Sequence, residues 1–160
     1  MGPWYAPRGA ANVRAKKSPV AIQALARYTH GVDPKDLEAL ARIFARFPQV
    51  QAAFLFGSRA RGEAGPRSDW DFALLLDSPE PDPRPEILGA LVEAGYEPLD
   101  LLLLNEAPPA LALEAAQGRL LYAREGFSLG EYVSRLAREV WDLEPLFRLQ
   151  REALKRRWSP

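Results

Sequence analysis

The chain has no cysteine and only one histidine among its 160 residues. Without cysteine it can form neither a disulfide nor a thiolate zinc site, and thiol-based catalysis is excluded. The histidine, His30, lies at an expected helix end, where capping carbonyl groups is favoured over general-base catalysis. A chain without cysteine suits a reducing compartment, so we expect a cytoplasmic protein.

Long apolar runs and an excess of charge of either sign are also missing. The longest apolar stretch, residues 99–104, contains Asp100 and is far shorter than the roughly 20 residues that span a bilayer. No apolar segment followed by a small-residue cleavage site is found near the amino end, so we expect no signal peptide. The 21 basic and 21 acidic residues cancel, which disfavours nucleic-acid binding by bulk charge. We therefore expect a soluble protein without membrane association.

The remaining composition is typical of a globular domain, with 48% hydrophobic and 26% charged residues. We divide the chain into an amino-terminal arm with a short helix (1–32), a central domain (33–124) and a carboxy-terminal helical extension (125–160). In the first part, Ser18-Pro19 is a helix-start pattern, and the helix is expected to reach about Tyr28.

Helix and strand patterns alternate through the central domain. Strands are expected at 50–56, 69–77, 97–104 and 119–123, and helices at 33–47, 86–94 and 108–117. The mixed order predicts an α/β or α+β fold, with a mixed central sheet of about four strands flanked by helices.

The carboxy-terminal residues predict one long helix that begins with the capping-box pattern at residues 128–131. Its apolar stripe consists of Tyr132, Val133, Leu136, Val140 and Phe147. Pro145 is expected to kink the helix. The stripe can either complete the domain core or bind a partner, and core packing is the favoured role of Trp141.

The most informative motif is Gly57-Ser58, ten further residues, and then Asp69-Trp70-Asp71. Alternate side chains of a strand share a face, so Asp69 and Asp71 point one way and Trp70 the other. The Gly-Ser turn offers backbone N–H groups and a hydroxyl to an anion. Asp100 is a third lone carboxylate in an apolar stretch, and the three acids converge if its strand lies beside that of Asp71.

Unpaired carboxylates in apolar strands are costly unless something compensates their charge. Mg²⁺ does so, since it prefers one or two carboxylates together with phosphate oxygens and water. Three carboxylates can hold two ions about 3.5–4 Å apart, which promotes in-line displacement at phosphorus. The alternative is structural: Asp69 caps a turn, Asp71 pairs with an arginine and Asp100 marks a strand edge.

These motifs resemble those of the nucleotidyltransferases of the DNA polymerase beta superfamily, in particular the minimal nucleotidyltransferases (MNT, MntA-like antitoxins). The segments 54–63 and 68–72 carry the resemblance, and 118–122 is similar to the usual end of the domain. The resemblance covers about residues 33–124. Trp70 departs from the aliphatic residue usual at its position, although it remains apolar.

The resemblance implies a polymerase-beta-like nucleotidyltransferase fold and a two-metal site. Asp69 and Asp71 would bind both Mg²⁺ ions, and Asp100 would complete the catalytic metal site and help to deprotonate the acceptor hydroxyl. Gly57 and Ser58 would hold the phosphates of ATP.

The resemblance also suggests phosphate contacts from two arginines. A guanidinium suits phosphate because it donates hydrogen bonds in pairs. Arg59 is therefore predicted to bind the nucleotide, with a solvated surface position as the alternative. For Arg61 the surface position is favoured.

The resemblance further implies transfer of AMP from ATP to a protein hydroxyl. Proteins of this group commonly pair with HEPN-domain toxins and adenylylate a toxin tyrosine, so a HEPN-type toxin is the expected partner, and homo-oligomers are compatible with the sequence. One alternative is a small-molecule, aminoglycoside-type nucleotidyltransferase, although these usually carry an additional acceptor-binding domain. Another is a non-catalytic antitoxin that acts by binding. A template-directed polymerase is disfavoured because no basic, thumb-like domain is evident.

Overall fold

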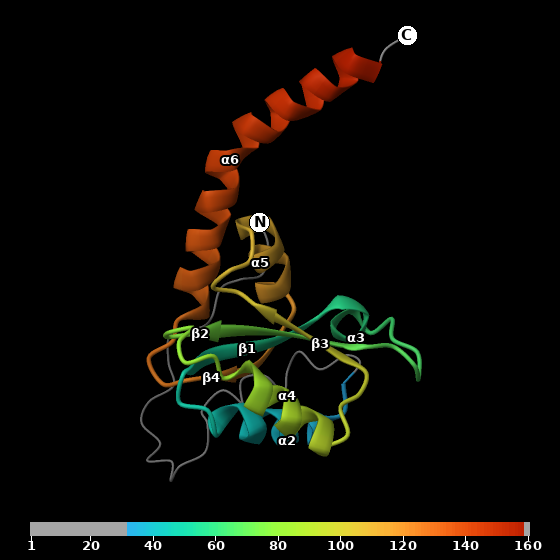
Figure 1. Cartoon of the computed structure of the whole chain (residues 1–160), viewed down its shortest axis with the longest axis vertical. Helices are drawn as coiled ribbons and strands as arrows, with labels where there is room; N and C mark the ends of the chain where they lie inside the picture. The colour runs from blue at the N-terminus through green and yellow to red at the C-terminus, as the bar shows by residue number, and fades with distance from the viewer. Residues whose placement is uncertain (1–31, 159–160) are drawn as a thin grey trace, which may run out of the picture.

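The computed structural model describes residues 32–158 (Figure 1). The expected helix at 18–28 and His30 lie outside the described residues. The elements are α2 (Pro34–Ala45), β1 (Val50–Phe56), α3 (Gly57–Arg61), β2 (Trp70–Leu76), α4 (Arg84–Glu93), β3 (Leu99–Leu103), α5 (Pro109–Ala116), β4 (Arg119–Ala123) and α6 (Leu129–Trp158). Among these residues, no helix is both long and apolar enough to cross a bilayer.

The four strands form one mixed sheet in the order β3-β2-β1-β4. β1 pairs antiparallel with both β2 and β4, whereas β2 and β3 are parallel. The predicted sheet of about four strands flanked by helices is confirmed, and β3 lies directly beside β2 as the edge strand.

Helices cover both faces of the sheet, with α2 and α4 on one side and α5 and the first half of α6 on the other (Figure 1). The strands are apolar on both faces for this reason. In β2, Phe72 and Leu74 pack in the α2/α4 core, whereas Ala73 and Leu75 pack in the α5/α6 core. Asp71 lies two residues before Ala73 in the strand, so its side chain is on the same face, the one covered by α5 and α6.

The helix starts follow local sequence chemistry. The carboxylate of Asp33 accepts a hydrogen bond of 2.8 Å from the backbone N–H of Lys35, which caps α2 as its sequence predicts. The hydroxyl of Ser128 accepts from the N–H of Glu131 and caps α6 in the same way. The helix expected at 86–94 begins earlier, at Arg84, because proline is tolerated in the first turn and Pro85 does not delay the start.

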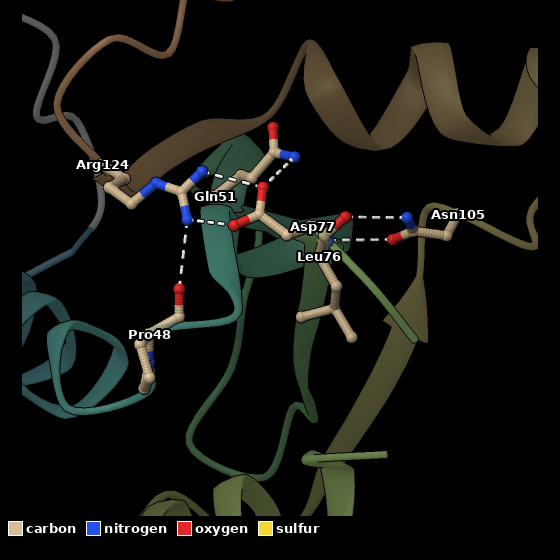
Figure 2. A network of polar contacts seen from close by, with 6 residues as sticks. All are labelled: Pro48, Gln51, Leu76, Asp77, Asn105 and Arg124. Carbon is tan, nitrogen blue, oxygen red and sulfur yellow. Dashed lines mark hydrogen bonds and ion pairs between the residues drawn. The ribbon is translucent and has the colours of Figure 1, made fainter. Parts of the chain in front are cut away.

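A polar network joins the sheet strands at the end of β2 (Figure 2). Asp77 accepts hydrogen bonds from Arg124, which follows β4, and from the side-chain amide of Gln51 in β1 at 2.6 Å. Arg124 also donates to the carbonyl of Pro48 at 3.1 Å. The Arg124 guanidinium is the main cause of the lowered pKa of Asp77.

The same end of β2 is closed on its other side by Asn105. Its side-chain amide donates to the carbonyl of Leu76 and its side-chain oxygen accepts from the N–H of Leu76, both at 2.9 Å (Figure 2). Asn105 therefore continues the hydrogen-bonding ladder beyond Leu103, where β3 ends.

The first part of α6 packs against the domain, and the rest of the helix projects from it (Figure 1). Tyr132 and Leu136 are buried in the α5/α6 core. Beyond them the helix, which contains Pro145, bends and extends away from the sheet (Figure 1). The large apolar side chains exposed there are Trp141, Leu146, Phe147 and Leu149. The expected core packing of Trp141 is wrong: its side chain is 80% exposed because α6 leaves the domain before reaching it.

We predict that Arg124→Gln lowers the melting temperature at neutral pH and that this loss disappears in acid. The pKa of Asp77 is lowered in the folded chain, so its stabilising contribution is present above its ordinary pKa and is lost as the pH falls through the lowered one. Thermal unfolding at neutral pH and at about pH 2–3 checks this. Arg42→Gln, which breaks an exposed pair within α2, is the control and should have a smaller effect. An equal loss at both pH values would contradict the assignment.

Candidate active site

The Gly-Ser turn begins where β1 ends. Phe56 is the last residue of β1, and α3 starts at Gly57 with φ +69°, a left-handed conformation that favours glycine. A Cβ atom at this position would lie 2.2 Å from Oδ2 of Asp71. The carboxylate of Asp71 is therefore packed against the backbone of the turn, and glycine is required by both space and conformation.

The carboxylates of β2 and β3 meet on the same face of the sheet. Asp71 and Asp100 are direct partners in the parallel register, so their side chains leave the sheet on the same side. Asp69 precedes the first residue of β2, Trp70, whose N–H donates to the carbonyl of Pro98 at 2.8 Å. This hydrogen bond ties the start of β2 to the segment that leads into β3.

The charges of the three acids act on one another. The pKa of Asp71 is raised, mainly by burial and then by the negative charges of Asp100 and Asp69, against smaller opposing effects of Arg61 and Arg59. Asp71 is half-buried, whereas Asp69 and Asp100 are exposed. Negative charge thus accumulates at the half-buried carboxylate beside the Gly-Ser turn.

The chemistry of these donors suits a divalent cation. In residues 32–158, no group of three or more Asp, Glu, His or Cys side chains is arranged so as to hold a metal ion. One oxygen of Asp100 accepts a hydrogen bond of 2.9 Å from the N–H of Leu101. The donors are nevertheless the hard oxygens that Mg²⁺ prefers, and a cation would offset both the burial and the repulsion that raise the pKa of Asp71.

The two arginines of α3 have different surroundings. The guanidinium of Arg59 donates to the backbone carbonyls of Ser68 and Asp69 and lies over the ring of Trp70. Arg61 donates to Glu63 at 2.9 Å, and its pKa is raised mainly by that hydrogen bond and charge, with smaller contributions from Glu114 and Asp71.

Arg61 is therefore paired with Glu63, and its positive charge, like that of Arg59, also acts on Asp71. Sequence reasoning gave it less weight than Arg59. It also missed Glu114 of α5, whose charge reaches Arg61, because nothing in the sequence places α5 near α3.

Serine 58 is only half-buried, so its hydroxyl is not enclosed in the core. It follows Gly57 directly, at the turn against which Asp71 packs. A second glycine, Gly118, lets the end of α5 approach β1 closely, since a Cβ there would lie 2.3 Å from the carbonyl oxygen of Leu55. The Gly-Ser turn, the acid pair and α5 are thereby held around one end of the sheet.

The mixed sheet thus carries paired carboxylates beside a Gly-Ser turn. A model of the family "Polymerase beta, Nucleotidyltransferase" matches residues 38–126, more than half of the 160-residue chain. The chain belongs to this family. The helix α6 and the residues before 38 lie outside the match, and the domain limits of 33–124 stay a prediction.

The chain is also similar to individual proteins and solved structures. The chain is 26% identical over 137 residues to "Protein adenylyltransferase MntA" of Aphanizomenon flos-aquae (strain 2012/KM1/D3), an overlap of 76% of this chain and 91% of the relative. The fold is similar to that of a toxin–antitoxin structure with AMP-PNP, with a TM-score of 0.57, 20% identity and coverage of 74% of this chain and 94% of the other. It is also similar to a toxin–antitoxin MntA–HepT structure, with a TM-score of 0.54, 18% identity and coverage of 76% and 95%.

We predict that Gly57→Ala disrupts the site more than a glycine substitution elsewhere. The added methyl group would overlap the Asp71 carboxylate and would strain a left-handed residue by about 1–2 kcal/mol. Gly126→Ala is the matched control, because Gly126 also has a positive φ, +86°, but has no atom within 4 Å of the added Cβ. Thermal unfolding and nucleotide binding check both variants. Equal losses in both would show that backbone strain alone, and not the contact with Asp71, determines the effect.

We also predict that Asp71→Asn raises the melting temperature of the metal-free protein at neutral pH. For a carboxyl whose folded pKa is raised, the favourable contribution is present below its ordinary pKa and is lost as the pH rises through the folded value. The amide keeps the shape and removes both the buried charge and its repulsion with Asp100 and Asp69.

Thermal unfolding at neutral pH with a chelator measures this effect of Asp71→Asn. Asp77→Asn should have the opposite effect, because the Asp77 carboxylate is paired with Arg124 and its pKa is lowered. A lower melting temperature in both variants would contradict the repulsion at Asp71.

Proposed function

We propose that this protein is an Mg²⁺-dependent protein adenylyltransferase that transfers AMP from ATP to a hydroxyl group of a partner protein. The observation that carries this proposal is the pairing of Asp71 with Asp100 beside the Gly57 backbone. The similarity to the MntA adenylyltransferase supports the activity, and the similarity to a toxin–antitoxin structure containing AMP-PNP supports a nucleoside triphosphate as donor.

The acids would hold Mg²⁺ in this reaction. Asp69 and Asp71 would contribute to both ion sites, and Asp100 to the catalytic one. Bound Mg²⁺ supplies charge neutralisation for the triphosphate and lowers the pKa of the acceptor hydroxyl. Asp100 is exposed on the edge strand, where it can accept the proton of that hydroxyl.

The Gly-Ser turn would hold the phosphates. The backbone N–H groups of the turn and the hydroxyl of Ser58 can donate to phosphate oxygens, and Gly57 allows the nucleotide to approach the backbone. Arg61, whose charge already acts on Asp71, would add a positive charge once the triphosphate competes with Glu63 for it. The acceptor oxygen then bonds to the α-phosphorus while the bond to the bridging oxygen breaks and pyrophosphate leaves.

The acceptor is proposed to be a HEPN-type toxin, with this chain as its antitoxin. The described residues form one sheet with its covering helices and the projecting α6, and they include no second domain that could form a small-molecule acceptor pocket. A protein acceptor can reach Asp100 because β3 is the edge strand. The MntA–HepT similarity supports the same class of partner.

We predict that labelled ATP and Mg²⁺ place label on the co-encoded partner protein, and that Asp69→Asn with Asp71→Asn abolishes the labelling. Autoradiography of the separated proteins measures the transfer, and growth of cells that carry the toxin measures neutralisation. Asp82→Asn is a control, since Asp82 pairs with Arg84 at the start of α4. If the double variant still neutralises the toxin fully, the protein acts by binding. If label appears on a small molecule, the acceptor class is wrong.

A further inference from the structure

Arg59 connects the two halves of the site motif. It lies in α3, directly after Ser58. Its Nε donates to the carbonyl oxygen of Ser68 at 3.1 Å and to that of Asp69 at 3.2 Å, and one Nη also donates to Ser68. Its Cζ atom lies 4.2 Å from the centre of the Trp70 ring. One side chain thus contacts the three consecutive residues that precede Asp71.

The Trp70 ring is itself fixed to the core on the face opposite the acids. It packs edge-on against Tyr96, with ring centres 5.0 Å apart, and stacks with Phe72 at 5.9 Å. The hydroxyl of Tyr96 in turn donates to Asp36 of α2 at 3.2 Å. Arg59 therefore rests on an aromatic cluster on the face of the sheet opposite the Asp71 side chain.

Backbone hydrogen bonds hold both ends of the segment that Arg59 contacts: the N–H of Ser68 donates to the carbonyl of Gly65 at 3.1 Å, and that of Trp70 donates to the carbonyl of Pro98 at 2.8 Å. Asp69 lies before the first residue of β2, so strand pairing does not fix its side chain. The residues between α3 and β2 include Gly62, Gly65 and Pro66 and form turns rather than a regular element. A metal-binding constellation has to be held to within about 0.5 Å of its working geometry.

We propose that Arg59 is a positioning residue that clamps the segment 68–70 to α3 and so sets Asp69 relative to Ser58. This inference rests on the proposed function, and it assigns Arg59 a role other than the phosphate contact predicted from the sequence. Arginine suits the role because the edge of its planar guanidinium can bind carbonyl oxygens while its face stacks on an indole. Lysine offers a single ammonium group and cannot do both.

The test compares Arg59→Gln, Trp70→Leu and the double variant in adenylylation of the partner protein. A clamp predicts that each single variant lowers kcat by about 10²-fold, the effect of misplacing reacting groups by about 1 Å. The KM for ATP should change by less than about threefold, since no nucleotide contact is lost. The double variant should be no worse than the more affected single variant, because the two residues act as one unit. Arg59→Lys should fail to restore kcat, whereas Trp70→Phe, which keeps an aromatic face, should retain most of it.

A second measurement does not depend on catalysis. Hydrogen exchange of residues 67–71, followed by mass spectrometry in the free protein, should be faster in Arg59→Gln and Trp70→Leu. Arg46→Gln is the matched control, because Arg46 also lies over an aromatic ring, that of Phe47, at 5.9 Å at the end of α2. This variant should leave both kcat and the exchange of residues 67–71 unchanged.

Three results would overturn the clamp. The first is a tenfold or greater rise in the KM for ATP in Arg59→Gln with kcat intact and with Trp70→Leu unaffected, which would make Arg59 a phosphate ligand. The second is unchanged hydrogen exchange of residues 67–71 in both single variants. The third is full activity in Arg59→Lys, which would show that charge alone suffices. If the wild-type protein adenylylates nothing, the proposed function fails, and the exchange measurement still decides the role of Arg59.

Discussion

The contact between the Asp71 carboxylate and the backbone of Gly57 is the feature on which the rest of the site depends. It brings an anion to a turn that itself presents N–H groups for anions, on a strand whose neighbour carries Asp100 in register. The pKa of Asp71 is raised, first by burial and then by the negative charges of Asp100 and Asp69. A bound cation would offset both effects, because it favours the charged form of a carboxyl group.

The two ends of β2 differ in how well their polar groups are paired. At one end of β2, Arg124 donates to Asp77, and Asn105 forms two hydrogen bonds with the backbone of Leu76. At the other end, the acids near the start of β2 are exposed or half-buried, and they repel one another. Between these ends, β2 is packed on one face by the α2/α4 core and on the other by the α5/α6 core. The packed strand therefore connects the end with paired polar groups to the end whose carboxylates repel one another.

Much of this arrangement could be predicted from the sequence, and particular residues show why. The strand at 50–56 was placed correctly because it is a mostly apolar run between Pro48 and Gly57, and the strand at 119–123 because it follows Gly118. Asp69, Asp71 and Asp100 were recognisable because lone acids in apolar strands are unusual. The three acids meet only because β3 lies beside β2. No local sequence pattern determines this neighbourhood, and the observed sheet order provides it.

What the sequence could not provide were contacts between residues far apart in the chain or between side chain and backbone. The position of Glu114 near Arg61 depends on how α5 crosses the sheet. The partners of Arg59 are backbone carbonyls, which carry no sequence signature, so the residue was interpreted through its charge alone. Trp141 was expected to pack in the core, but the sequence of a helix does not reveal where the helix leaves its domain.

The projecting half of α6 has a consequence for the protein in a cell. It exposes a row of large apolar side chains, Leu146 and Leu149 each by at least 60%, on a helix that is anchored only at its base. Water solvates such a surface poorly, and a lone helix end opens readily to proteases. The lifetime of the chain would therefore depend on the concentration of the molecule that covers this helix. Copies in excess of that molecule would be degraded first.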